Sequence, residues 1–174
     1  LARHAGAKVV VVDVGVASDM GSPDGLICRK VAAGTKNMRV GPAMERAEAL
    51  AALEADIDVA QREIAAGADM IALGEMGIGN TTAATAVTAA VTGKAVADLT
   101  GTGTGIDEER RALKVRVIED ALSLHAPSVD DPVALLACVG GFEIGAIAGA
   151  TLAAAAHRVP VVVDGFISTA GALV

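Results

Sequence analysis

The residues best suited to chemistry lie in one stretch, 73–82, with the sequence L-G-E-M-G-I-G-N-T-T. An apolar run precedes it, and segment 81–91, without proline or glycine, follows it. This order predicts a strand, a tight glycine turn and a helix. Glycines leave backbone N–H groups uncovered, and the start of a helix adds unpaired N–H groups and the positive end of its dipole. The stretch therefore predicts a site for an anion such as phosphate.

Two familiar glycine motifs each fail at one position of this stretch. Its spacing matches a Walker loop, but Asn80 stands where the phosphate-binding lysine belongs. As a dinucleotide fingerprint, it has Thr82 in place of the third glycine. A plain turn between strand and helix, with no ligand, stays an alternative. Glu75 favours a functional turn, because a site for phosphate alone would not contain a carboxylate.

A second glycine loop, G-T-G-T-G at 101–105, precedes a helix that we predict from Asp107 to His125. Lys114 lies on this helix, and its neighbours three and four positions away include no acid. One interpretation is an ordinary solvated lysine, as most surface lysines are. The other is that this cation, close to a glycine loop, completes a phosphate site.

Three apolar runs deliver an acid at their carboxyl ends: Asp13, Glu75 and Asp164. In a parallel α/β sheet these ends share one edge, where ligands bind. Alternatively, one or more of the acids caps the loop or helix that follows. A ligand with a phosphate and with hydroxyl groups for the carboxylates, such as a ribose 5-phosphate unit, suits both halves of this site.

The composition predicts an α/β fold with a parallel sheet. The chain has 174 residues, of which 53% are hydrophobic and 1% aromatic, and it contains 20 glycines. Alanine and valine supply most of the apolar mass, which suits helices packed closely on a sheet. Gly141, Gly145 and Gly149 recur every fourth residue, so they form one helix face without side chains. This face predicts that the helix packs closely against a neighbouring element. We expect strands over 8–14, 69–73 and 160–164, and the first of them should be buried on both faces. Segment 17–42 should be mostly loop. We expect helices over 43–66, with Pro42 at its start, 81–91, 107–125, capped by Asp107, 132–138, capped by Asp131, and 142–157.

Charge and cysteine content exclude several classes of protein. The net charge of −7 argues against nucleic acid and anionic membranes as partners. Cys28 and Cys138 have no partners at metal-ligand spacing, so we expect no metal site, no disulfide framework and a cytoplasmic setting. The longest weakly polar segment, 144–156, is too short to span a bilayer. The chain begins without methionine and stops within a further predicted helix, so we expect a piece of a longer chain.

Several motifs in order resemble one family: G-E-M-G-I-G-N-T-T at 74–82, G-T-G at 103–105 with the acidic turn and Lys114 after it, G-G-F-E-I at 140–144 and V-V-V-D-G-F-I at 161–167. V-V-D-V-G-V at 11–16 and G-T-x-N-M at 34–38 fit as well. Together they resemble the nicotinate-nucleotide–dimethylbenzimidazole phosphoribosyltransferases of cobalamin assembly. The resemblance covers essentially the whole chain, as one core domain over 1–174.

The resemblance implies a reaction in which 5,6-dimethylbenzimidazole displaces nicotinate from nicotinate mononucleotide, giving α-ribazole 5′-phosphate without metal or cofactor. It implies a Rossmann-like parallel sheet with helices on both faces, a three-layer α/β/α arrangement truncated here at both ends, in a homodimer. The phosphate would lie on the backbone near Gly77 and Gly103, within reach of Lys114, and Glu75 near the ribose. The substrate-binding residues expected in all are Glu75, Gly77, Ile78, Gly79, Asn80, Thr81, Gly103, Thr104, Gly105, Lys114, Asp164 and Gly165.

The chain departs from the family in one respect. The family's general base is a glutamate in a glycine-rich loop that would follow Val174, so we expect no catalytic base within this segment and little turnover by it alone. A non-catalytic nucleotide-binding or dimerisation module is therefore an alternative. An oxidoreductase is a third, although the incomplete glycine fingerprint speaks against it.

Overall fold

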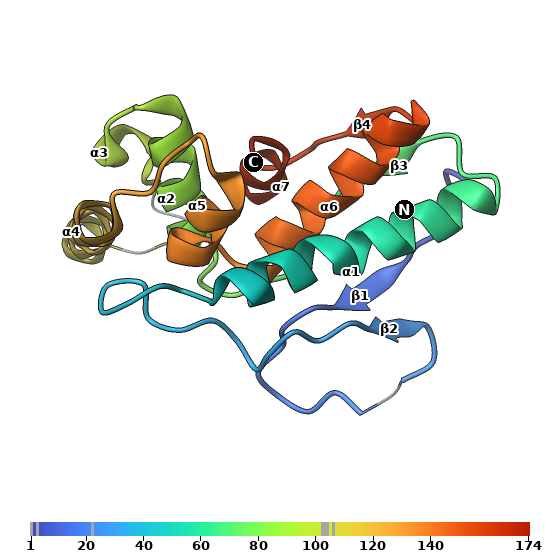
Figure 1. The fold of residues 1–174 in the computed structure, drawn as a ribbon, viewed down its shortest axis with the longest axis horizontal. Helices are drawn as coiled ribbons and strands as arrows, with labels where there is room; N and C mark the ends of the chain where they lie inside the picture. The colour runs from blue at the N-terminus through green and yellow to red at the C-terminus, as the bar shows by residue number, and fades with distance from the viewer. Residues whose placement is uncertain (1, 3, 22, 102–104, 106) are drawn as a thin grey trace.

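The computed structural model describes residues 2, 4–21, 23–101, 105 and 107–174. The described chain contains four short strands and seven helices, and five of the helices follow one another with no strand between them (Figure 1). They are β1 (Val11–Asp13), β2 (Leu26–Cys28), α1 (Arg46–Ala65), β3 (Ile71–Ala72), α2 (Thr81–Thr92), α3 (Val96–Leu99), α4 (Glu108–His125), α5 (Pro132–Val139), α6 (Phe142–His157), β4 (Val161–Val162) and α7 (Phe166–Ala172). No helix in this part of the chain is long and apolar enough to cross a membrane.

The strands of the described residues form two separate parallel pairs, β1 with β2 and β3 with β4. The predicted α/β class and parallel pairing are confirmed. The prediction that the strands ending in Asp13, Glu75 and Asp164 share a sheet is wrong, because β1 pairs with β2. β2 lies within the segment 17–42 that we expected to be mostly loop, where a three-residue strand among glycines leaves little periodic signal.

Helices α1 and α6 lie side by side and form the centre of the packing (Figure 1). A Cβ atom at Gly145 would come within 3.1 Å of the Ala52 Cβ, and one at Gly149 within 2.0 Å of the Leu53 carbonyl oxygen. The two backbones therefore approach as closely as the small-residue face predicted. This confirms that the spacing of these glycines serves packing.

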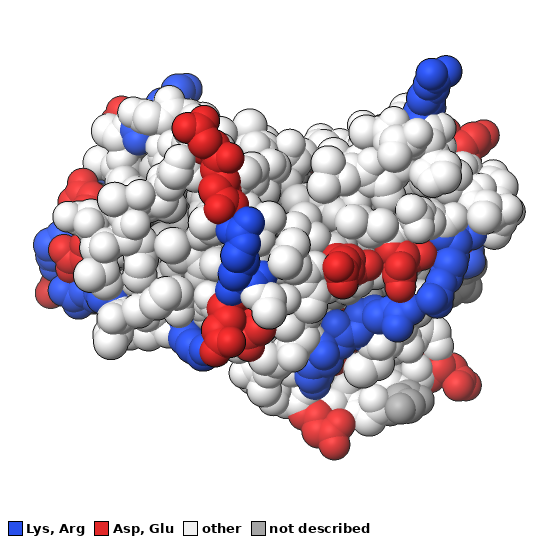
Figure 2. All heavy atoms as spheres, in the orientation of Figure 1, with Lys and Arg blue, Asp and Glu red and all other residues white. Residues whose placement is uncertain are grey.

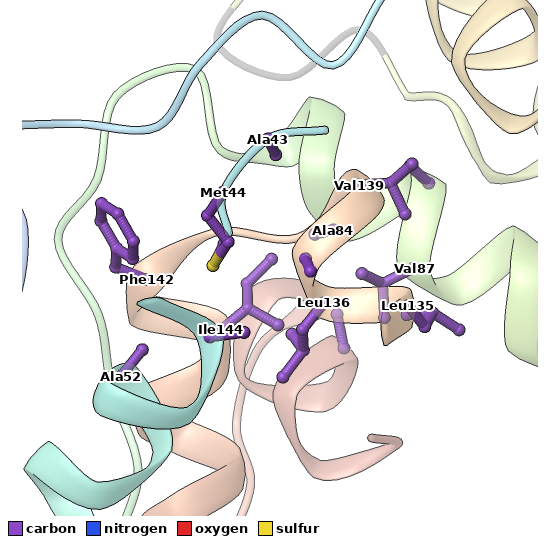
Figure 3. Close-up of a cluster of buried hydrophobic side chains, with 14 of the residues drawn as sticks. Ala43, Met44, Ala52, Ala84, Val87, Leu135, Leu136, Val139, Phe142 and Ile144 are labelled. Carbon is purple, nitrogen blue, oxygen red and sulfur yellow. The ribbon is translucent and has the colours of Figure 1, made fainter. Parts of the chain in front are cut away.

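The main core joins segments far apart in the sequence, and aliphatic side chains fill most of it. Figure 3 shows Met44, just before α1, together with side chains from α2, α5 and the start of α6. Phe142 is buried and occupies the space that a Cβ at Gly15 would need, 2.5 Å from its ring. This contact attaches the turn after β1 to the beginning of α6.

Side-chain caps mark the starts of three helices of the described chain. Asp107 and Asp131 cap α4 and α5 as predicted, each accepting a hydrogen bond from a first-turn N–H, at 2.8 and 3.0 Å. The prediction that Pro42 begins a helix is wrong. Helix α1 begins at residue 46, because Glu45 and Glu48 form a capping box there.

The first strand is less buried than its β-branched sequence predicts. Val9 is 66% and Val11 51% exposed, whereas Asp13 and Val14 are buried. The prediction of burial on both faces is therefore wrong for this strand within the described chain. The remaining pattern is that of a strand covered on one face.

Candidate functional site

The predicted glycine turn joins β3 to α2, and its geometry leaves the start of α2 open. Gly79 has a φ of +82°, in the left-handed region that favours glycine. Asn80 occupies the N-cap position of α2, but its side chain makes no capping hydrogen bond and instead donates to the Glu75 carboxylate. None of the first residues of α2 is acidic. The first N–H groups of the helix are thus left without a side-chain cap, and this arrangement suits an anion.

Lys114 reaches this turn from α4. Its ammonium group donates a hydrogen bond to the hydroxyl of Thr81, the first residue of α2. The side chain is half-buried, and burial lowers the pKa of Lys114. Lys114 is therefore only partly solvated, and its role toward a phosphate stays a prediction. The cation lies next to the start of α2.

Two of the three predicted acids lie at one edge of the β3–β4 pair. The Leu73 N–H donates to the Val162 carbonyl at 3.0 Å, so the parallel strands end together. Glu75 lies three residues after the end of β3, and Asp164 lies two residues after the end of β4. Asp164 is exposed and accepts a hydrogen bond of 3.4 Å from Ser168. This edge carries two carboxylates next to the glycine turn.

The third acid, Asp13, is not part of this edge, and the alternative of a capping acid is the correct one. Its carboxylate accepts hydrogen bonds from the N–H groups of Gly15, at 3.0 Å, and Val16, at 2.9 Å. Lys30 lies 3.3 Å away. Burial raises the pKa of Asp13, but these hydrogen bonds and the lysine outweigh it and hold the pKa below its ordinary value. Asp13 therefore stabilises the turn after β1.

Glu143, in the first turn of α6, is a residue that the sequence did not single out. Burial raises the pKa of Glu143, and the negative charge of Glu75 raises it further, while a hydrogen bond from Asn80 lowers it. Glu143 thus lies beside the glycine turn. An acid in the first turn of a helix is common for reasons of the helix dipole, so its position in G-G-F-E carried no distinguishing signal.

The other predicted site residues have varied positions. Gly103 and Thr104 lie outside the described residues. Gly105 is exposed with a φ of +103°, and Gly165 precedes α7 in open space. The side chain of Ile78 is fully exposed, so in this chain only its backbone faces the turn.

A cavity of about 750 Å³ lies between residues 36–46 and α5. None of the predicted site residues lines it. Within loop 34–38, the ammonium group of Lys36 lies 3.3 Å from the Glu45 carboxylate, and Met38 is buried. Among the described residues, no cluster of three or more His, Cys, Asp or Glu side chains could hold a metal ion.

The parallel strands, the glycine turn, the uncapped helix start and the half-buried lysine are those of an α/β protein. In α/β proteins with parallel sheets, ligands commonly bind at the carboxyl ends of the strands. Comparison with known proteins gives the family. A family model described as Phosphoribosyltransferase matches residues 1–174, and the chain belongs to this family.

Individual relatives agree with this assignment. Over all 174 residues, the chain is 58% identical to the nicotinate-nucleotide–dimethylbenzimidazole phosphoribosyltransferase of Geobacter metallireducens and 56% identical to that of Desulforudis audaxviator. The crystal structure of CobT from Thermus thermophilus matches 99% of this chain with a TM-score of 0.94 and 45% identity. The chain covers 49% of each of the two sequences and 51% of the crystallised chain, so it spans about half the length of these relatives. The family resemblance drawn from the motifs is confirmed.

Proposed function

We propose that this chain binds the phosphoribosyl part of nicotinate mononucleotide, for transfer to 5,6-dimethylbenzimidazole with release of nicotinate. The observation that carries the proposal is the contact between Lys114 and Thr81. This contact brings together a cation, a glycine turn and an uncapped helix start. Each of the three favours the binding of a phosphate at this point. Relatives that share more than half of the aligned residues have this activity in their names.

The phosphate accepts hydrogen bonds from backbone N–H groups around Gly77 and Gly79 and from the start of α2. Lys114, half-buried and with a pKa lowered by burial, gains a counter-charge when the phosphate arrives. Binding of the phosphate therefore favours the charged form of the lysine. The proposal also includes the expected contact of the phosphate with the backbone at Gly103, which lies outside the described residues.

The ribose lies toward Glu75 and Asp164. Carboxylates accept strong hydrogen bonds from sugar hydroxyls, and they attract the positive charge that a ribosyl carbon carries while nicotinate leaves. Both acids follow the ends of the paired strands β3 and β4, which fixes their backbones relative to each other. The proposal also includes a homodimer, no metal, and a three-layer Rossmann-like arrangement for the complete enzyme.

Calorimetric titration of the 174-residue chain with nicotinate mononucleotide tests this proposal. We expect saturable binding, and binding of nicotinate riboside, which lacks the phosphate, that is weaker by about 10-fold or more. Absence of binding by the mononucleotide would overturn the proposal. Equal affinity for the two ligands would show that the turn and Lys114 do not hold a phosphate.

A further inference from the structure

Asn80 occupies a position where its side chain would ordinarily cap a helix, but it makes a different contact. Asparagine at an N-cap usually accepts a hydrogen bond from an N–H group of the first helical turn. The Asn80 side chain makes no such bond, and its amide donates instead to the Oε2 atom of Glu75. Both side chains are half-buried. The amide is therefore committed to the acid of the glycine turn and not to α2.

The two glycines of the segment G-I-G at 77–79 are needed for different reasons. Gly79 has a left-handed φ, which favours glycine, whereas the φ of Gly77 lies outside that region and does not require glycine. A Cβ at Gly77 would lie 2.4 Å from the Asn80 amide nitrogen and 3.1 Å from the Glu75 Oε2 atom. A side chain at position 77 would therefore displace the amide from the carboxylate. Gly77 provides the space in which the two groups meet.

We propose that Asn80 is a positioning residue, which holds the Glu75 carboxylate in the orientation in which it meets the ribose, in space that Gly77 leaves open. This inference rests on the proposed function, since it describes the same site. It assigns to Asn80 an action through Glu75 rather than a direct contact with the substrate.

The physical reason is that a glutamate side chain rotates freely unless something holds it. Ordering such a side chain when a ligand binds weakens the affinity, so a side chain that is already held binds more tightly. An amide suits this purpose, because it donates a hydrogen bond without neutralising the carboxylate. A carboxylate can accept about four hydrogen bonds, so one amide N–H leaves acceptor sites for sugar hydroxyls. The same orientation of Asn80 leaves the first N–H groups of α2 to the phosphate.

The first experiment observes the side-chain amide of Asn80 by ¹H–¹⁵N NMR in the ligand-free chain. The sequence contains two asparagines, Asn37 and Asn80, and one glutamine, so the Asn80 signals are assigned from their loss in Asn80→Ala. We expect one Asn80 amide proton to resonate downfield and to exchange slowly with water. Glu75→Ala should abolish both properties, and Gly77→Ala should weaken them, while the Asn37 signals stay unchanged. Asn80 signals that respond to neither substitution would overturn the proposal.

The second experiment measures the affinity for nicotinate mononucleotide in a double-mutant cycle. We expect Asn80→Ala to weaken binding about 5-fold, the effect of one side chain that must be ordered by the ligand. In a chain that already carries Glu75→Ala, the same substitution should change the affinity by less than about 2-fold, because the amide acts only through the carboxylate. Asn37→Ala, at an exposed asparagine, is the matched control and should bind as the unaltered chain does. An equal loss with and without Glu75, or no loss at all, would overturn the positioning role.

Inorganic phosphate, which has no ribose, separates this role from a role in the anion site. Its affinity, followed by ³¹P NMR, should be the same in Asn80→Ala and in the unaltered chain, and a parallel loss would show that Asn80 serves the phosphate instead. If the unaltered chain does not bind nicotinate mononucleotide, the proposed function fails, and with it the role toward the ribose. The amide spectra still decide whether Asn80 holds Glu75. Circular dichroism of each variant shows whether a change comes from unfolding.

Discussion

At the level of single residues, two acids that are shielded from solvent have pKa values shifted in opposite directions. Asp13 is buried but has hydrogen-bond donors and Lys30 beside it, and its pKa is lowered on balance. Asp56, on α1, has its pKa raised by burial, and its Oδ1 atom has no hydrogen-bond partner among the described residues. The difference lies in the partners and not in the degree of burial.

Asp13→Asn should lower the free energy of unfolding at pH 7 by about 2 kcal/mol, because it removes charged hydrogen bonds from a buried turn. A carboxyl whose folded pKa is lowered stabilises the protein above its unfolded value, here 3.8, and loses this effect as pH falls through the folded pKa. The difference between variant and unaltered chain should therefore shrink below pH 3.8. Urea unfolding at pH 7 and pH 3 measures it, with the exposed Asp24→Asn as control. A constant difference at both pH values would contradict the assignment.

Asp56→Asn should do the reverse and stabilise the protein at pH 7, by on the order of 1 kcal/mol, the scale of an unsatisfied buried polar atom. The raised folded pKa means that the unaltered chain loses stability as pH rises from 3.8 through the folded pKa. The gain in the variant should therefore be present at pH 7 and disappear below pH 3.8. Thermal unfolding across this range provides the measurement, and a variant less stable than the unaltered chain at pH 7 would disprove the expectation.

At the level of elements, the contact of α1 with α6 depends on the absence of side chains. Gly149→Ala should destabilise the protein by about 3 kcal/mol or more, because its Cβ would lie 2.0 Å from a backbone oxygen of α1. Gly145→Ala, where the neighbouring atom is a methyl group at 3.1 Å, should cost less. Gly41→Ala, whose Cβ meets no atom within 4 Å, is the matched control. Urea midpoints should fall in the order control, Gly145→Ala, Gly149→Ala.

The same elements show which features the sequence could predict. Helices α2, α4, α5 and α6 were predicted nearly to the residue, because glycines, capping aspartates and a proline mark their ends. Strand β2 and the four-residue α3 were missed, since neither is long enough to show a period. Which strands pair depends on contacts across the whole chain. The spacing of residues could therefore not show whether the strands before the three acids belong to one sheet.

The candidate site was predicted in part for a related reason. Lys114 stood out because no acid on its own helix could pair with it, and the structure brings it to Thr81. Asp13 had the same sequence context as Glu75 and Asp164, and only the fold shows that its carboxylate turns back to its own backbone. The influence of the Glu75 charge on the pKa of Glu143 acts between residues 68 positions apart, and no local pattern reveals it.

For the molecule as a whole, a net charge of −7 means that any anion must be held locally. Figure 2 shows a row of basic side chains on this face with acidic side chains next to it. Ion pairs such as Lys8–Glu63, at 2.6 Å, and Arg29–Asp58, at 3.6 Å, occupy several of these cations. The attraction of a phosphate therefore depends on the few groups around the glycine turn rather than on the overall field.

Because these groups come from β3, α2, α4, β4 and α6, a ligand that binds them should stabilise the whole fold. Nicotinate mononucleotide at 100 times its dissociation constant should raise the free energy of unfolding by about 2.7 kcal/mol. At that fixed concentration, Lys114→Met should lose about half of this gain or more, because its affinity falls by about 10-fold or more. Arg116→Met, at an exposed position of the same helix, should keep it. Urea unfolding with and without ligand makes the comparison, and an equal gain in both variants would show that Lys114 takes no part in binding.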